Sequence, residues 1–159
     1  MSKPELLAAG AIAPNFNYRD FEGVERNTAD LAGNPHVVYF YPKDDTPGCT
    51  REACAFRDAG PVFSGRKVEI IGVSPDSDAS HEKFRLKHNL PFGLAADTDH
   101  SISKAYGAWG PKKFMGREYE GVHRVTFLVD SDGKIAKVYP KVKPLEHPVE
   151  IAADLENMS

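Results

Sequence analysis

The chain contains two cysteines, Cys49 and Cys54, and their placement predicts thiol chemistry. Cys49 follows a loop rich in proline and glycine that starts at Pro42, and Cys54 falls inside the helix expected to follow. The two thiols then have different environments, which suits a reaction with one attacking and one resolving thiol. Two cysteines in a chain of this size do not make a disulfide scaffold, and a cytosolic setting keeps them reduced at rest. Such a pair is more often catalytic, redox-active or metal-binding than structural.

The expected position of Cys49 favours its thiolate, which is the nucleophilic form. It lies at or beside a helix N-terminus, where free backbone N–H groups and the helix dipole stabilise an anion. At pH 7 only about 3% of an ordinary thiol is ionised, so full ionisation gains roughly thirtyfold, far below the accelerations of enzymes. The site must therefore also position a substrate and stabilise its leaving group. The Thr46 hydroxyl and an arginine elsewhere in the chain are candidates for these roles.

Regular helix geometry keeps the two thiols apart. Residues five positions apart in an α-helix have Cα atoms about 8.6 Å apart and point about 140° away from each other. A disulfide normally requires a Cα separation below about 7 Å. Cys49 and Cys54 can therefore bond only if the first turns of the helix unwind. This spacing predicts a helix that is intact in the reduced protein and locally unfolded in the oxidised one.

The elements that must position this segment alternate between strand and helix. Residues 36–41 form a nearly continuous β-branched and aromatic run, typical of a strand buried on both faces, and Pro42 ends it. The remaining pattern predicts a hairpin at 16–25, helices at about 50–59, 78–88, 101–106 and 146–158, and strands at 68–73, 92–95, 122–129 and 134–139.

This order predicts a single α/β domain over residues 1–159, with a central mixed sheet flanked by helices on both faces. The cysteine loop then lies at the carboxyl end of a central strand, where open α/β sheets place their sites. The predicted hairpin at 16–25 extends this unit at its N-terminal side.

Composition argues against several functional classes. The 159 residues are 41% hydrophobic and 27% charged, which is ordinary for a globular protein. The 20 basic and 23 acidic residues are well mixed, and no basic block indicates nucleic-acid binding. No apolar stretch approaches the length that crosses a bilayer, so no membrane association is expected. The short apolar stretch at 6–13 lacks the basic region of a secretory signal, which predicts a cytoplasmic protein.

Metal and cofactor sites are not expected. The six histidines are not paired at metal-ligand spacing, and two thiols alone lack the four ligands of a structural zinc site. Asp130, Asp132 and Gly133 superficially resemble part of a calcium loop, but the further ligands of that loop are missing. We interpret this segment as the turn of a hairpin between the last two predicted strands.

Other polar and aromatic residues allow plain structural interpretations. Asp44 and Asp45 are interpreted as solvated loop charges rather than as acid–base catalysts. Cys54 would also suit a helix face as a small buried side chain. Trp109 and the segment beginning at Phe114 either line the entrance to the site or cover the core, and the sequence favours neither.

The residues around the first cysteine resemble a known family. Pro42-x-x-x-Thr46-x-x-Cys49 is similar to the peroxiredoxin active-site motif Pro-x-x-x-Thr/Ser-x-x-Cys. The wider segment 39–58 resembles the peroxiredoxin Q subfamily, also called bacterioferritin comigratory proteins. The resemblance continues through residues 106–110, 114–116 and 121–130, so it spans nearly the whole chain.

This resemblance implies a thioredoxin-like fold and thiol-dependent reduction of hydroperoxides. It makes Cys49 the peroxidatic cysteine and Cys54 the resolving cysteine. It further implies that Thr46 contacts the bound peroxide, that Pro42 shields the thiolate and that Arg124 is the activating arginine.

The resemblance also implies a partner and a reaction cycle. Hydrogen peroxide and organic hydroperoxides are the expected substrates, and thioredoxin or a similar dithiol is the expected reductant of a monomeric enzyme. A disulfide reductase is a weaker interpretation, because the chain lacks a C-x-x-C motif. A redox sensor or thiol-switched chaperone, in which oxidation drives binding, is the alternative from another functional class.

Overall fold

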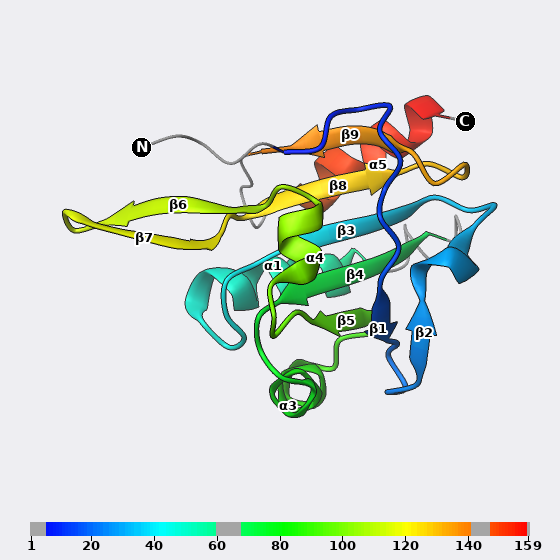
Figure 1. Ribbon diagram of the computed structural model, residues 1–159. Coiled ribbons are helices and arrows are strands. Elements are labelled where there is room, and N and C mark those ends of the chain that lie inside the picture. The colour runs from blue at the N-terminus through cyan, green and yellow to red at the C-terminus, as the bar shows by residue number, and fades with distance from the viewer. Residues whose placement is uncertain (1–5, 60–67, 141–146, 159) are drawn as a thin grey trace.

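The computed structural model describes residues 6–59, 68–140 and 147–158 and contains a seven-stranded sheet (Figure 1). Its strands are β1 (Asn17–Arg19), β2 (Glu25–Asn27), β3 (His36–Phe40), β4 (Glu69–Ser74), β5 (Gly93–Ala96), β8 (Val125–Val129) and β9 (Ile135–Tyr139). Their order is β2-β1-β5-β4-β3-β8-β9, with β3, β4 and β5 parallel and the outer strands antiparallel. The predicted mixed sheet is therefore confirmed.

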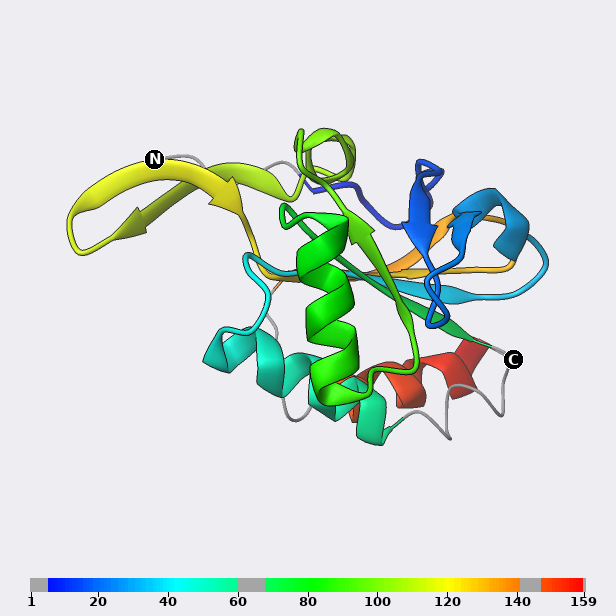
Figure 2. The same ribbon diagram turned by 90° about the horizontal axis from the view of Figure 1, so that it is seen from below.

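Helices cover both faces of this sheet (Figure 2). On one face lie α1 (Pro47–Asp58), α3 (Asp78–His88) and α5 (His147–Met158), and on the other lies α4 (Ser101–Ala105). Each face carries its own cluster of buried apolar side chains, with Phe56 and Phe84 in one cluster and Tyr106 and Phe127 in the other. None of the described helices is both long and apolar enough to cross a membrane.

The predicted N-terminal hairpin is present, with its second strand slightly later than expected. Asn17 pairs with Asn27 in β1 and β2, and a short 3-10 helix, η1 (Thr28–Leu31), follows. Arg19 pairs with Leu94, which joins the hairpin to the edge of the parallel strands. The hairpin thus extends the central sheet.

The hairpin of β6 and β7 was not predicted. Strands β6 (Trp109–Phe114) and β7 (Arg117–Val122) pair in a separate two-stranded sheet that projects from the body (Figure 1). Four of the six residues of β7 are exposed, so this strand lacks the apolar alternation by which a strand is predicted. The single strand predicted over 122–129 is consequently divided, and a break at His123 and Arg124 separates β7 from β8.

The local structure before Cys49 explains where its helix begins. All five residues of β3 are buried, as predicted for a central strand. Thr46 is the N-cap residue in an extended conformation, and Pro47 is the first residue of α1, three residues earlier than expected. Proline suits this first position because its missing N–H would have no helical partner and its φ is already helical. Cys49 therefore lies within the first turn of the helix.

Candidate active site

The Cys49 thiol is buried at the N-terminus of α1. Its side chain is 1% exposed, and the first helical hydrogen bond runs from the Thr50 N–H to the Thr46 carbonyl at 2.8 Å. The N–H groups of Gly48 and Cys49 precede this bond and so have no acceptor within the helix. These groups and the positive end of the helix dipole lie beside the sulfur, and the predicted position of Cys49 at a helix N-terminus is confirmed.

Arg124 is brought to this thiol by strand register. Phe40, the last residue of β3, pairs with Val125, the first residue of β8, so Arg124 lies beside the loop that follows β3. Its Nη2 donates a hydrogen bond to Cys49 Sγ at 3.2 Å. A Cβ atom on Gly48 would lie 3.3 Å from the same Nη2, so glycine leaves room for the guanidinium.

Glu52 holds the other side of the guanidinium. Arg124 Nη1 donates to Glu52 Oε1 at 3.0 Å, while Oε2 has no hydrogen-bond partner among the described residues. Burial raises the pKa of Glu52 to about 7, although the charge and hydrogen bond of Arg124 lower it. Glu52 was not among the residues predicted for the site. Its spacing of three from Cys49 on a helix, which places both side chains on one face, was the available signal.

Lys112 adds a second cation near the site. It comes from β6, and its Nζ donates to the Val122 carbonyl at 2.8 Å. Burial lowers the pKa of Lys112, Arg124 lowers it further, and Cys49 raises it, so the three groups interact electrostatically. Gly121 leaves space for the aliphatic part of the Lys112 side chain, because a Cβ there would lie 3.2 Å from Lys112 Cδ. This residue was missed because the β6–β7 hairpin itself was not predicted.

The other predicted site residues lie on either side of Cys49. Pro42 is partly buried at the start of the loop. The Thr46 hydroxyl does not cap α1 and donates instead to the Lys43 carbonyl at 2.9 Å. Cys49 and Cys54 are free thiols, and Cys54 is partly exposed. Both lie in the continuous helix α1, so the separation calculated for a regular helix applies to this state.

The prediction that Asp44 is a solvated loop charge is wrong. Its Oδ1 accepts a hydrogen bond from the Tyr41 hydroxyl at 2.6 Å, and its Oδ2 accepts one from Ser80 at 2.8 Å. Its backbone N–H donates to Asp76 at 2.7 Å. Neighbouring Asp45 is exposed, as predicted. The sequence does not reveal the difference, because it depends on α3 and the end of β4 lying against the loop.

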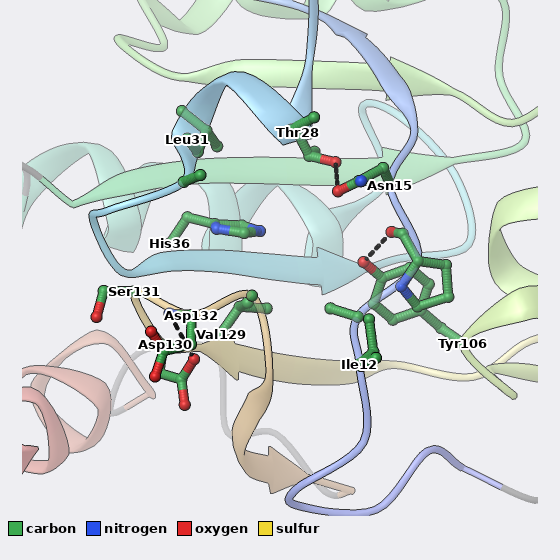
Figure 3. A pocket seen from close by; sticks show the side chains of 15 residues that line it. Ile12, Asn15, Thr28, Leu31, His36, Tyr106, Val129, Asp130, Ser131 and Asp132 are labelled. Atoms are coloured by element: carbon green, nitrogen blue, oxygen red, sulfur yellow. Dashed lines mark hydrogen bonds between the residues drawn. The ribbon is translucent and has the colours of Figure 1, made fainter.

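A cavity of about 270 Å³ lies at the opposite end of the sheet (Figure 3). His36, the first residue of β3, is among its lining residues, whereas the cysteine loop follows the last residue of β3. Burial lowers the pKa of His36 to about 4, so its ring is neutral at pH 7, and its Nδ1 has no partner among the described residues. No cysteine lines this cavity, which is therefore separate from the thiol site.

The open question about Trp109 is answered by its contacts. Its ring stacks on His100 with 4.0 Å between ring centroids and packs against the apolar cluster on the α4 face. It therefore covers core. The side chain of Phe114 lies outside the described part of the structure. The turn interpreted from Asp130 to Gly133 is confirmed, since it joins β8 to β9 and the Gly133 N–H donates to the Asp130 carbonyl.

Comparison with known proteins gives consistent matches. Residues 9–138 match the AhpC/TSA family. The chain is 45% identical to peroxiredoxin Bcp of Bacillus subtilis over 153 residues, covering 96% of this chain and 98% of the relative. It is 43% identical to peroxiredoxin Bcp of Escherichia coli K12, covering 89% and 90%.

Solved structures agree with these matches. A cysteine-to-serine variant of Xanthomonas campestris peroxiredoxin Q superposes with a TM-score of 0.85 at 32% identity, covering 99% of this chain and 100% of that one. The bacterioferritin comigratory protein of the same organism, described for its alkyl peroxide reduction activity, gives a TM-score of 0.83 at 33% identity. It covers 90% of this chain and 91% of that one.

Proposed function

The chain belongs to the AhpC/TSA family and, within it, to the peroxiredoxins named Bcp or peroxiredoxin Q, and we propose that Cys49 is the residue that attacks the peroxide. Membership makes the protein a thiol peroxidase. The observation that most supports the assignment of Cys49 is the 3.2 Å contact between its sulfur and Arg124 Nη2 at a helix N-terminus. This surrounding favours the thiolate and offers a fixed cation to the reacting atoms.

The first step is attack of the Cys49 thiolate on the terminal peroxide oxygen. A sulfur–oxygen bond forms and the O–O bond breaks, and its electron pair leaves with the second oxygen. That oxygen takes a proton and departs as water or an alcohol, and the cysteine becomes a sulfenic acid. Arg124 stabilises the charge that develops on the leaving oxygen. We include alkyl hydroperoxides among the substrates because the Xanthomonas campestris relative is described for its alkyl peroxide reduction activity.

Thr46 and Pro42 orient the peroxide and protect the thiolate in this scheme. The hydroxyl proton of Thr46 is engaged by the Lys43 carbonyl, so its oxygen remains an acceptor for the O–H of an incoming hydroperoxide. Pro42 stands at the start of the same loop, where its ring limits the access of water. In this arrangement Arg124 binds one peroxide oxygen as a donor, and Thr46 binds the other as an acceptor.

Cys54 resolves the sulfenic acid. Its thiol condenses with Cys49, a disulfide forms and water leaves, which prevents further oxidation of the sulfur. Thioredoxin or a similar dithiol then reduces the disulfide by exchange and is itself oxidised. The partial exposure of Cys54 on the same helix supports this role. Because both thiols belong to one chain, the cycle needs no second protomer, and we expect a monomer.

Mass spectrometry after stoichiometric peroxide treatment tests this cycle. We expect a disulfide between residues 49 and 54 in the wild type, no reaction in Cys49→Ser and a trapped sulfenic acid in Cys54→Ser. Rapid reaction of Cys49→Ser with peroxide would overturn the assignment of the nucleophile. Repeated turnover of Cys54→Ser with thioredoxin would remove Cys54 from the resolving role.

A further inference from the structure

A buried histidine fixes the cysteine loop to helix α3. His81 Nδ1 lies 2.8 Å from Asp44 Oδ2, and the two side chains are only 5% and 4% exposed. The other ring nitrogen, Nε2, lies 3.1 Å from the Ala95 carbonyl oxygen at the end region of β5. The loop that precedes Cys49 is thereby joined through one imidazole ring to both α3 and β5.

The hydrogen-bond partners of this pair account for its polar atoms. The Ala95 carbonyl can only accept, so His81 Nε2 carries a proton. Asp44 accepts hydrogen bonds from the hydroxyl groups of Tyr41 and Ser80, and its Oδ2 also contacts His81 Nδ1. A buried hydrogen bond therefore joins His81 Nδ1 to the Asp44 carboxyl group. Each oxygen of the carboxylate and each nitrogen of the ring has a partner.

We propose that His81 and Asp44 are positioning residues for peroxide reduction, which place the cysteine loop so that Cys49 meets Arg124. This role rests on the proposed function. Cys49 lies in α1 and Arg124 lies in the break before β8, so their 3.2 Å contact depends on where the loop before α1 is held. Asp44, two residues before Thr46, anchors the loop. Its carboxyl group contacts His81, and its backbone N–H donates a hydrogen bond to Asp76.

The reaction of Cys49 with peroxide is sensitive to small displacements of the reacting groups, and this sensitivity sets the expected effect on its rate. A shift of about 1 Å in a reacting group lowers a rate by roughly 100-fold, because attack requires aligned atoms at close distance. An unaligned thiolate still reacts with a small alkylating agent, which needs neither Arg124 nor Thr46. Loss of the His81–Asp44 pair should therefore slow the peroxide reaction much more than alkylation of the same cysteine.

The test compares two second-order rate constants of Cys49, one with hydrogen peroxide and one with iodoacetamide, in the reduced full-length protein at pH 7. His81→Gln can still donate to the Ala95 carbonyl but not to Asp44, and Asp44→Asn removes the charge. We expect each to lower the peroxide rate by roughly 100-fold and the iodoacetamide rate by less than about threefold.

Rescue by a conservative variant separates positioning from general destabilisation. In His81→Asn the amide nitrogen takes the place of Nδ1 and can donate to Asp44, so the peroxide rate should return to within about tenfold of the wild type. Asp45→Asn is the matched control, because it removes the exposed contacts of the same loop with Lys87 and His88. Asparagine suits the positive φ of 58° there, and both rates should stay at the wild-type values.

The outcomes distinguish failure of the positioning role of His81 and Asp44 from failure of the proposed peroxidase function of Cys49. Folded His81→Gln and Asp44→Asn with wild-type peroxide rates, or with both rates lowered equally, would overturn the positioning role. If neither variant folds by circular dichroism, Ser80→Ala takes their place, since it removes one hydrogen bond to Asp44 and uncovers no charge. A selective loss of several-fold in its peroxide rate is then expected, and an unchanged ratio overturns the role. A wild type that reacts no faster with peroxide than with iodoacetamide would instead overturn the proposed function.

Discussion

Arg124 lies between two acidic groups, and its place depends on residues that carry no thiol chemistry. Its guanidinium donates to Cys49 Sγ through Nη2 and to Glu52 Oε1 through Nη1. Glu52 thus orients the arginine, and Gly48 provides the space that the guanidinium occupies. At the scale of single residues, we expect the reactivity of Cys49 to depend on Arg124, Glu52 and Gly48 together.

Substitution of Gly48 by alanine should lower peroxide reactivity without lowering stability. The added Cβ would lie 3.3 Å from Arg124 Nη2, tighter than ordinary contact, and the bond to Glu52 restricts the guanidinium. We expect a peroxide rate about tenfold lower, equivalent to about 1.4 kcal/mol in the barrier. Thermal unfolding should occur at the same or a higher temperature, because alanine favours helix over glycine by about 1 kcal/mol.

Stopped-flow kinetics and thermal denaturation measure the two effects of Gly48→Ala. Arg51→Ala, at an exposed position of the same helical turn, is the control and should keep the wild-type rate. A wild-type peroxide rate in Gly48→Ala would show that the guanidinium has room to move.

Helix α1 combines a reactive end with a fixed end. Its later turns pack into the core, where Ala53 and Phe56 are fully buried and the Phe56 ring stacks on Tyr39 with 4.9 Å between centroids. The loop before it is held at Asp44. We therefore expect unwinding of this element to be confined between Asp44 and Phe56, the segment that contains both cysteines.

Oxidation should unfold this segment alone. Closing the disulfide requires Cα atoms nearer than about 7 Å, which the helical spacing does not allow. We expect backbone amides of residues 50–54 to exchange with deuterium at least about tenfold faster in the oxidised protein, because they lose helical hydrogen bonds. Amides of α3 serve as the internal reference and should not change.

Peroxide-treated Cys54→Ser is the matched control for this exchange experiment. It forms no disulfide within the chain, so its helix should keep the protection of the reduced protein. Equal protection of residues 50–54 in reduced and oxidised wild type would contradict the unwinding.

Two buried titratable groups influence the stability of the whole molecule in opposite directions. Burial raises the pKa of Glu52 from 4.5 to about 7, so the folded protein holds a proton that the unfolded chain releases as pH rises. Its contribution to stability is complete below pH 4.5 and is lost as pH rises through 7. Burial lowers the pKa of His36 from 6.5 to about 4, so its contribution is present above pH 6.5 and is lost as pH falls through 4.

These opposite contributions should nearly cancel in the wild type between pH 5 and pH 7. On raising the pH across this range, Glu52 lowers and His36 raises the free energy of unfolding, each by about 2 kcal/mol. Relative to the wild type, Glu52→Gln should therefore gain about 2 kcal/mol from pH 5 to pH 7, and His36→Phe should lose about as much.

Urea unfolding of the three proteins at pH 5 and pH 7 measures these differences. Each variant is compared with the wild type at the same pH, so groups common to both proteins drop out of the comparison. Parallel pH dependence of all three proteins would contradict the assigned pKa shifts.

Local features of the chain were predictable because they depend on neighbours in sequence. The motif from Pro42 to Cys49, the buried strand before it, the helix after it and the separation of Cys54 all follow from short-range patterns and helix geometry. The α/β class followed from the alternation of such elements. The β6–β7 hairpin did not, because its exposed residues carry no apolar periodicity.

Contacts across the fold were decided only by the tertiary structure. Cys49 and Arg124 are 75 positions apart and meet because β8 pairs with β3 in a register that ends beside the cysteine loop. Asp44 and Asp45 are adjacent acidic residues, yet only Asp44 is buried, because α3 and β4 lie against its side. The sequence by itself determined which thiol chemistry is available. The sheet order and register determined which charged groups surround the thiol, since distant contacts depend on how elements pack rather than on local propensity.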